Sequence, residues 1–455
     1  MKQPSITVTF AELAATAIQR GERGIIAMIL KSDTASSQGA FSFTKATEIP
    51  ATFDSTCAAQ IKLAFIGYQN PPKKVLGFVL KATDYTYTPA TLAECDNPVS
   101  EGWYELSGED YVLSADTIAK SGVLYYEEDE QSETGYSQVN DVNYASNPKT
   151  SGWYELVGGV WTASNDTYPV TGKTYYTKSA GTSNVTDYTA AYDYLSGVKF
   201  QYLVVPTVAT DGQTSGVVSF VKEQRGEGNL IKAILPNTAA DHEGIINVTT
   251  PAWIEGETVY TAEQYCSRVA GIIAGTPLTM SATYAPVTEL TDCTHLTKSE
   301  ADAAAEAGQF IAMWDGEKVK MGRAITSLVT TSATKNTQYQ KIKIVDAMDM
   351  ISTDVRKTCE DSYIGKYPNT YSNKLSLIAA ISGYFDGLVL DTVISGYTIG
   401  IDIDANKLYL QGRGVDTSEM TDQELKTANT GSSVFLVATI SMVDAIEDII
   451  LPIYI

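Results

Sequence analysis

Residues 342–388, IKIVDAMDMISTDVRKTCEDSYIGKYPNTYSNKLSLIAAISGYFDGL, decide how the second half of the chain folds. Their apolar residues recur at three- and four-residue steps on both sides of a break at Gly365 and Pro368, which predicts two amphipathic helices joined by a turn. Such an αα-hairpin buries its apolar stripes against each other and against a sheet. The solvent face of the first helix is expected to carry its charged residues, which are Asp346, Asp349, Asp354 and Lys357.

Length and charge exclude several classes of protein. A chain of 455 residues with 44% hydrophobic and 19% charged residues is expected to fold into two to four domains. Its 54 acidic and 32 basic residues give a net charge of −22, which repels nucleic acid and anionic membranes. The chain has no run of 18 apolar residues and no signal-peptide core at its start. We therefore expect synthesis in a cytosol, no membrane insertion and five free cysteine thiols.

The part of the chain around residues 25–83 and 184–290 has the pattern of an α/β domain. Residues 24–30, GIIAMIL, form the continuous apolar run of a buried strand. Helical and strand-like segments then alternate as far as a helix near residues 262–274. This alternation predicts an open α/β sheet with crossover helices as the middle domain.

A tandem duplication interrupts that domain between residues 84 and 183. The pentapeptide GWYEL occurs at residues 102–106 and again at 152–156, an offset of 152 − 102 = 50, and Asn-Pro and Tyr-Tyr pairs recur at the same offset. Frequent glycine turns between aromatic and β-branched residues predict two small all-β modules. Their position within a loop indicates an insertion that protrudes from the domain.

Residues 291–455 are expected to form an α+β domain with a terminal strand arm. A capping box predicts a helix that begins after Thr297, and Asp315-Gly316 predicts a hairpin. A second hairpin is expected around residues 404–406. Residues 434–440 are apolar at nearly every position, which predicts a strand buried on both faces. The apolar tail at residues 449–455 needs a partner. Residues 1–24 form an arm, with a strand at residues 6–10.

No group of residues predicts catalysis. His242 follows Asp241, but no nucleophile elbow is present. Asp292, Cys293 and His295 lack a second ligand pair at zinc spacing. Asp402 begins a calcium-loop register that lacks its glycine and its final glutamate. Without a phosphate-binding glycine loop, the sequence predicts no catalytic residue, no cofactor and no metal.

Four segments resemble one family, in the order that the family has them. They are RGIIAMIL at residues 23–30, AGIIAGTPLTMSATY at 270–284, the hairpin sequence at 345–388, and VFLVATISMVDAIEDIILPIYI at 434–455. Together they resemble the contractile tail sheath proteins of myophages and of phage-tail-like bacteriocins. The resemblance covers the chain except for roughly residues 84–183.

The resemblance implies a structural subunit that polymerises helically around a tail tube and contracts to drive the tube through a cell envelope. The implied partners are copies of the chain, the tail tube protein, and baseplate and tail terminator proteins. The chain would be made in the cytoplasm of a bacterial host and would mature in a virion tail or an extracellular tail-like particle. No nucleotide would be consumed.

Both ends of the chain are expected to pair with neighbouring subunits as added strands. The residues expected in these contacts are Ile6, Val8, Phe10, Val434, Phe435, Leu436, Val437, Ile440, Ile453 and Ile455. Basic residues in an acidic chain are candidates for contact with a tube, and ordinary surface charge pairing is the alternative. They are Lys341, Lys343, Arg356 and Lys357.

Two other classes of function stay open at this point. Aromatic residues in the twin modules suggest a secreted or surface carbohydrate-binding or adhesive protein, although the missing signal peptide argues against it. An α/β enzyme with an accessory domain would need a ligand that no motif specifies.

Overall fold

The computed structural model describes residues 18, 20–82, 85–91, 95–170, 172–180 and 187–454. The chain is a mixed α/β protein that divides into two compact units. The main unit comprises Met1–Lys81 and Thr186–Ile455, and the insert unit is Ala82–Val185. In the part of the chain that the structure describes, no helix is both long enough and apolar enough to cross a bilayer.

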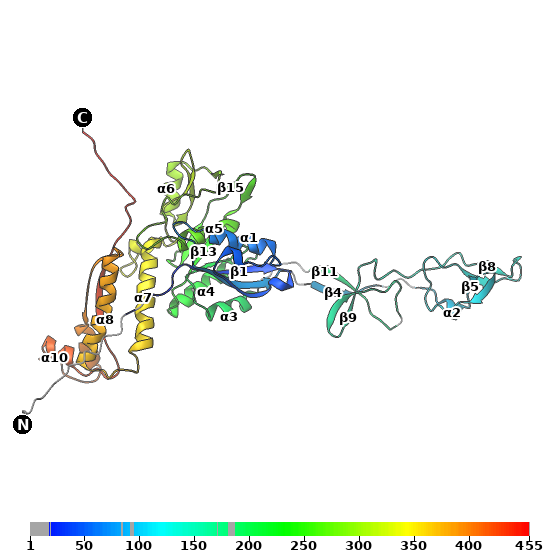
Figure 1. Cartoon of the computed structure of the whole chain (residues 1–455). Helices are drawn as coiled ribbons and strands as arrows, with labels where there is room; N and C mark the ends of the chain where they lie inside the picture. The colour runs from blue at the N-terminus through cyan, green and yellow to red at the C-terminus, as the bar shows by residue number, and fades with distance from the viewer. Residues whose placement is uncertain are drawn as a thin grey trace, which may run out of the picture. The chain divides into compact units, whose positions relative to one another are not determined.

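A seven-stranded sheet forms the centre of the main unit (Figure 1). Its strand order is β18-β14-β13-β12-β1-β3-β2, and every neighbouring pair is parallel except β2 and β3. The strands are β1 (Ile25–Ser32), β2 (Gly39–Phe43), β3 (Lys74–Lys81), β12 (Tyr202–Val204), β13 (Lys232–Pro236), β14 (Ile245–Val248) and β18 (Gln309–Phe310). Strand β18, which follows the boundary predicted at residue 290, completes the sheet.

Helices cover both faces of this sheet, as parallel strands require. Helices α1 (Ser55–Phe65) and α5 (Ala262–Ala274) lie on one face, and α3 (Thr189–Ser196) and α4 (Thr214–Gly226) lie on the other (Figure 1). Gly271 permits the close approach of α5 to α1, because a Cβ atom there would lie 2.3 Å from the Ala64 carbonyl oxygen.

Short elements before and after α5 add to the main unit. They are β15 (Trp253–Glu255), β16 (Thr258–Tyr260), β17 (Asp292–Cys293), α6 (Lys298–Glu306), β19 (Ala312–Trp314) and β20 (Val319–Met321). Thr297 and Glu300 form the predicted capping box of α6, and β19 and β20 form the hairpin predicted at Asp315-Gly316.

The hairpin segment at residues 342–388 forms α7 (Ile342–Ser362) and α8 (Tyr371–Leu390). Ile351 of α7 packs with Ile381, Phe385 and Leu388 of α8 in one apolar cluster. The prediction that Asp346, Asp349 and Asp354 lie on the solvent face of α7 is wrong, because all three are buried. Helix α7 packs against α8 on one side and against the seven-stranded sheet on another, so few of its residues before Asp354 reach solvent.

The structure also corrects the predicted hairpin around residues 404–406. Strand β21 (Ile394–Ile401) is followed by helix α9 (Ile403–Gln411), not by a second strand. The Asp402 carboxylate accepts a hydrogen bond from the backbone N–H of Ala405 and caps α9, which is the usual role of Asp at that position. A short helix, α10 (Asp422–Thr427), comes next.

Strand β21 pairs instead with β22 (Leu436–Met442) in a two-stranded antiparallel sheet. The prediction of a strand buried on both faces is wrong within the single chain. Leu436, Ile440 and Met442 face the apolar cluster under α8, whereas the opposite face of β22 is exposed. Of the outward positions in β22, only Val437 is a large apolar residue, so the strand alternates like any half-buried strand.

The insert unit contains two four-stranded sheets, ordered β6-β5-β7-β8 and β10-β9-β11-β4. Their elements are β4 (Tyr85–Pro89), α2 (Pro98–Glu101), β5 (Tyr104–Ser107), β6 (Asp110–Leu113), β7 (Tyr125–Glu128), β8 (Tyr136–Gln138), β9 (Tyr154–Val157), β10 (Val160–Ala163) and β11 (Tyr176–Ala180). Buried Tyr125 donates its hydroxyl proton to Asp116 over 2.8 Å. Tyr175 and Asp166 repeat this contact at 2.7 Å, so the duplication preserves its core.

The fourth strand of each sheet comes from the other repeat. β4 precedes the first GWYEL pentapeptide but pairs with β11 at the end of the second repeat. β8 precedes the second pentapeptide but pairs with β7 of the first repeat. The backbone N–H groups of Ala90 and Val139, just after β4 and β8, donate to the Tyr175 and Tyr125 carbonyls respectively. β4 and β8 therefore occupy equivalent positions in the two sheets.

Removal of one complete repeat should leave one complete module. Excision of residues 90–138 joins Pro89 to Val139 and keeps β4 beside β11. We expect a soluble chain whose main unit melts at an unchanged temperature by differential scanning calorimetry. A control deletion of residues 116–138 removes β7 and β8 and leaves the β5–β6 hairpin without the strand it pairs with. This deletion should increase proteolysis of the insert. Aggregation of the 90–138 excision variant would contradict the strand exchange.

Candidate functional site: a buried ion network and an assembly face

Asp349 of α7 is the centre of a buried ion network. Its two carboxylate oxygens accept a bidentate pair of hydrogen bonds from Arg225, each 2.9 Å long. Oδ2 also accepts from the Lys232 ammonium at 2.5 Å. Arg225 belongs to α4 and Lys232 is the first residue of β13, so one carboxylate joins α7 to a helix and to a strand of the sheet.

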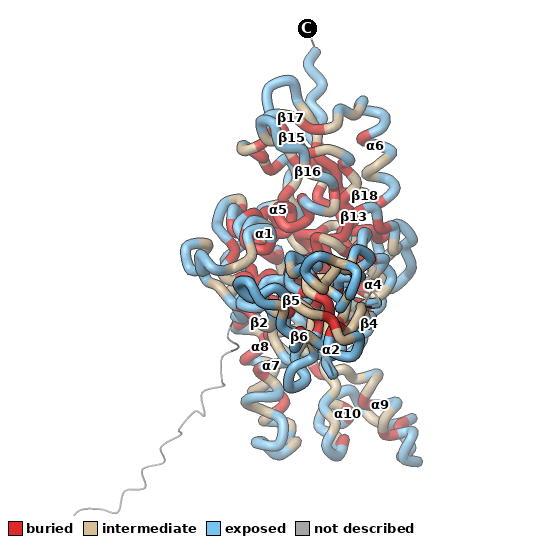
Figure 2. The backbone as a smooth tube through the Cα atoms, turned by 90° about the vertical axis from the view of Figure 1, so that its right-hand side faces the viewer, coloured by how far each residue is buried: buried red, intermediate tan, exposed pale blue. Residues whose placement is uncertain are grey.

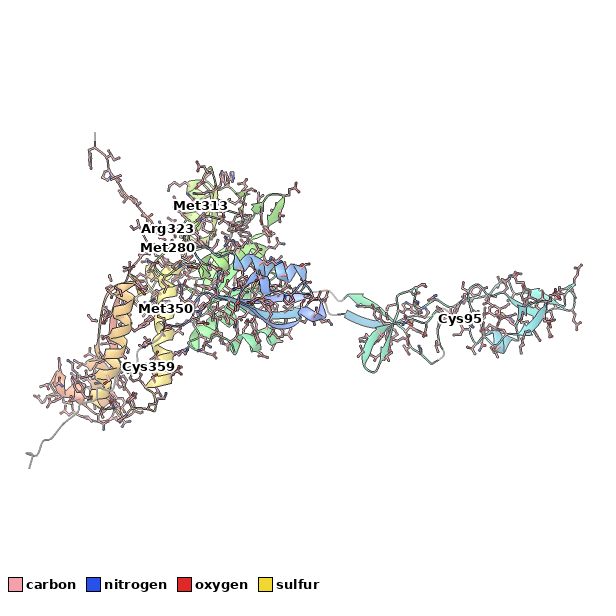
Figure 3. All side chains as sticks on the ribbon, in the orientation of Figure 1. Cys95, Met280, Met313, Arg323, Met350 and Cys359 are labelled. Carbon is pink, nitrogen blue, oxygen red and sulfur yellow. The ribbon has the colours of Figure 1, made fainter. Side chains whose placement is uncertain are left out.

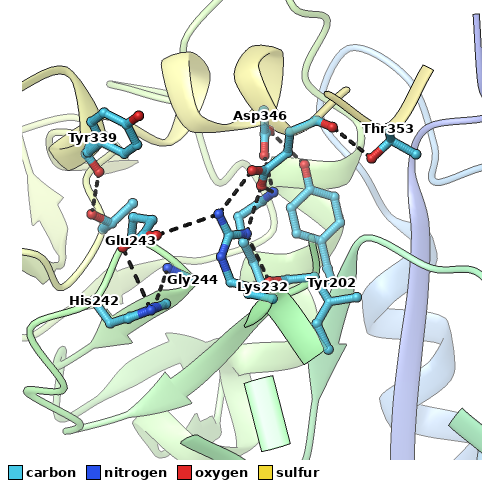
Figure 4. Close-up of polar contacts among 12 residues, drawn as sticks. Tyr202, Lys232, His242, Glu243, Gly244, Tyr339, Asp346 and Thr353 are labelled. Carbon is cyan, nitrogen blue, oxygen red and sulfur yellow. Dashed lines mark hydrogen bonds and ion pairs between the residues drawn. The ribbon is translucent and has the colours of Figure 1, made fainter. Parts of the chain in front are cut away.

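Asp346, one helical turn earlier, extends the network to two further strands (Figure 4). Its Oδ2 accepts hydrogen bonds from the Tyr202 hydroxyl at 2.6 Å and from Arg23 at 2.9 Å. Its Oδ1 lies 3.1 Å from the Lys232 ammonium. Tyr202 begins β12 and Arg23 lies just before β1. Helix α7 is thus held across the amino ends of three parallel strands.

Glu243 continues the network away from α7. Both of its carboxylate oxygens accept from the Lys335 ammonium at 2.8 Å, and Arg225 lies 3.8 Å away. His242 beside it is partly buried, and its Nδ1 accepts from the Gly244 N–H at 2.9 Å (Figure 4). His242 lies in a loop, not in a helix or strand.

Burial and charge act in opposite directions on this network. Burial disfavours the Asp349 carboxylate, yet Lys232 and Arg225 outweigh burial and hold the pKa of Asp349 below its ordinary value. Burial, reinforced by Asp346, raises the pKa of the Tyr202 hydroxyl well above its ordinary value. The Asp349 carboxylate is thus charged at neutral pH, and removing one partner of such a buried pair costs about 3–5 kcal/mol.

Besides the ion network, the main unit has a second candidate functional feature, the face formed by β21, β22 and the residues after β22. In the described part of the chain, these two strands pair only with each other, so each leaves one edge free for another strand. Beyond them, Ile449, Ile450, Leu451 and Ile453 are each at least 75% exposed. Figure 2 shows the described part of this C-terminal segment as exposed. Contiguous apolar exposure of this kind marks an interaction site.

The residues predicted to pair with neighbouring subunits lie in different parts of the structure. Ile6, Val8, Phe10 and Ile455 lie outside the described residues. Val434 and Phe435 precede β22, whereas Leu436, Val437 and Ile440 belong to it. Ile453 is exposed in the tail.

The four basic residues predicted to meet a tube also differ in environment. Lys341 pairs with Asp444, and Lys343 is buried with its ammonium on the Val443 carbonyl oxygen at 2.8 Å. Arg356 and Lys357 are exposed and line a cavity of about 520 Å³ beside α7. Arg356 and Lys357 are the exposed members of the set, whereas Lys341 and Lys343 are engaged with residues 443–447.

The ion network is the feature that sequence reasoning missed. Asp346 and Asp349 resemble ordinary polar positions of an amphipathic helix. The available signal was Lys232, a charged residue directly before the apolar run of β13, because a cation at that position needs a buried partner. Among the described residues, no group of three or more His, Cys, Asp or Glu side chains could hold a metal. His295 instead contacts Asp292 at 2.7 Å.

Two protein families match the chain. The phage tail sheath protein central domain matches residues 181–327, and the phage tail sheath C-terminal domain matches residues 334–455. A tail sheath protein of Clostridium phage phiCD119 is 40% identical over 257 residues, which cover 56% of this chain and 72% of that relative. Phage-like element PBSX protein XkdK of Bacillus subtilis is 31% identical over 186 residues, which cover 40% of this chain and 39% of that relative.

Solved structures share the fold. The sheath tail protein of Desulfitobacterium hafniense has a TM-score of 0.57 at 19% identity, covering 88% of this chain and 94% of that one. The helical sheath of the anti-feeding prophage in its contracted state has a TM-score of 0.58 at 10% identity, covering 100% and 99%.

The network predicts a large stability effect at Asp349. D349N should lower the free energy of unfolding at pH 7 by about 3–5 kcal/mol, because it leaves two buried cations short of a charged partner. The control D391N alters the exposed Arg20–Asp391 pair and should cost less than about 1 kcal/mol. Urea denaturation of the full chain measures both values.

The Asp349 effect should also depend on pH. Because the folded state holds the pKa of Asp349 below its ordinary value, the stability that this charge contributes is present above about pH 4. It is lost as pH falls through the lower, folded-state pKa. The difference between the unaltered chain and D349N should therefore shrink from about pH 5 towards pH 2. A difference that stays constant across this range would show that Asp349 contributes no charge.

Proposed function

The chain belongs to the phage tail sheath proteins, and on that premise we propose that its two ends tie each subunit of a contractile sheath to its neighbours. The exposed apolar tail at residues 449–454 carries this proposal, since no described part of the chain covers it. The related sheath proteins give no support to a carbohydrate-binding role.

Strand addition is the mode of contact that the fold favours. The two-stranded sheet β21–β22 offers free edges, and the tail of a second copy would add a strand to one of them. Backbone hydrogen bonds would supply affinity, and Ile450, Leu451 and Ile453 would bury apolar surface. The predicted strand at residues 6–10 would add to the sheet of another neighbour. Donor and acceptor surfaces differ, so these contacts are heterologous and build an open helix.

Such a lattice would surround a tail tube and shorten to drive it through a cell envelope. The work would come from additional burial between subunits, because the sequence carries no nucleotide-binding loop. Baseplate and terminator proteins would bound the lattice at its ends. The relatives locate such sheaths in virion tails and extracellular particles, and synthesis would take place in the host cytoplasm.

Contact with the tube would use the accessible basic residues. Arg356 and Lys357 are the exposed members of the predicted set, and in a chain of net charge −22 they offer rare attraction for acidic tube residues. Lys341 and Lys343 would instead hold residues 443–447 within the subunit.

Truncation tests the connector role of each end. Deletion of residues 448–455, or separately of residues 1–9, should give folded monomers with unchanged circular dichroism but no striated sheaths in electron micrographs. A length-matched control retains the tail and replaces Ile449, Ile450, Leu451 and Ile453 with Ser, and it should fail in the same way. Normal sheaths from either truncation would refute the role of that end.

Charge reversal tests the tube contact. The double variant R356E/K357E should reduce polymerisation on purified tubes at least about tenfold at low salt, where exposed charges are least screened. The difference in polymerisation between the unaltered chain and R356E/K357E should become smaller at high salt. K407E/K426E, a double reversal at lysines of α9 and α10, serves as the control for net charge. Equal polymerisation of the unaltered chain, R356E/K357E and K407E/K426E at low salt would rule out the contact with the tube.

A further inference from the structure

Residues 443–448, between β22 and the exposed tail, are fixed to the main unit by polar contacts. The backbone N–H of Val443 donates to the Val393 carbonyl oxygen at 3.1 Å. The Lys343 ammonium donates to the Val443 carbonyl oxygen, and the Lys341 ammonium pairs with Asp444. These residues have no regular secondary structure, so side-chain contacts hold them in place.

Glu447 makes the most extensive of these contacts. Its Oε1 accepts hydrogen bonds from the hydroxyls of Thr283 at 2.6 Å and Ser281 at 3.1 Å. Its Oε2 lies 3.4 Å from the Lys341 ammonium and 3.8 Å from the Arg323 guanidinium. Four groups from three separate segments thus surround one carboxylate.

The burial of Glu447 contrasts with the exposure of the tail beyond it. The Glu447 side chain is only 6% exposed, whereas Ile449, two residues later, is 81% exposed. Arg323, labelled in Figure 3, also binds the exposed Asp448 at 2.6 Å. Burying a carboxylate is costly unless it is paired. Lys341 and Arg323 provide this pairing for Glu447, next to the residue at which the exposed tail begins.

We propose that Glu447 is a positioning residue, which fixes the point and direction in which the tail leaves the subunit so that it meets the β21–β22 edge of a second copy. The inference rests on the proposed function of the tail as a connector. A fixed departure point lowers the entropy lost when the tail binds and raises its effective concentration at the neighbouring edge.

The variant E447Q tests the proposal, because it keeps an acceptor for the two hydroxyls and removes the ion pairs. We expect folded monomers and a critical concentration for sheath polymerisation raised about tenfold, measured by sedimentation. The control E306Q neutralises an exposed glutamate at the end of α6 and should leave the critical concentration unchanged.

A second variant covers the case in which E447Q does not fold. Insertion of Gly-Gly between Asp448 and Ile449 leaves every contact of Glu447 intact but frees the direction of the tail, and should raise the critical concentration similarly. Unchanged polymerisation by this insertion, or by a folded E447Q, overturns the proposal. Deletion of residues 448–455 separates the two ideas: if it abolishes sheaths while these variants assemble normally, only the positioning role fails.

Discussion

Two aspartates three residues apart on α7 hold the C-terminal half of the main unit against its sheet. Asp346 and Asp349 face Arg23, Arg225, Lys232 and Tyr202, which lie at or near the amino ends of parallel strands. Apolar packing alone would let α7 slide along the sheet, whereas bidentate and short ionic contacts specify one position. Helix α8 and the β21–β22 sheet pack on the apolar cluster beneath α7 and α8, so this network also fixes the position of the β21–β22 sheet.

A main unit held in this way suits a protein whose changes of state occur between copies. Breaking a buried ion network exposes unpaired charges and is costly, whereas the tail at residues 449–454 is exposed on its own subunit. If the proposed strand connections form, the least costly rearrangement of a lattice would therefore move whole subunits and leave those connections intact. The insert unit lies outside the matched sheath domains over nearly all of its length, and its first and last strands, β4 and β11, pair with each other.

Local signals in the sequence predicted much of the fold. Helix α5 spans the predicted residues 262–274 because its capping box and apolar period agree, and α6 begins where Thr297 predicts. Long-range choices were not predictable in the same way. Whether Asp349 meets water or Arg225 depends on a helix 124 residues away along the chain, and Asp402 caps a helix as readily as it ends a strand. The sequence of one repeat alone does not show that its first strand, β4 or β8, pairs in the sheet of the other repeat.

In the assembly that we propose, the tail of one subunit completes the β21–β22 sheet of another while the Asp349 network stays closed. A helical reconstruction of sheaths assembled from this chain, at a resolution that shows side chains, tests it directly. We expect residues 449–455 to form a strand hydrogen-bonded to the sheet edge of a neighbouring copy, with Arg225 still paired to Asp349. An ordered lattice in which this tail folds onto its own subunit, or in which α7 has left the sheet, would contradict it.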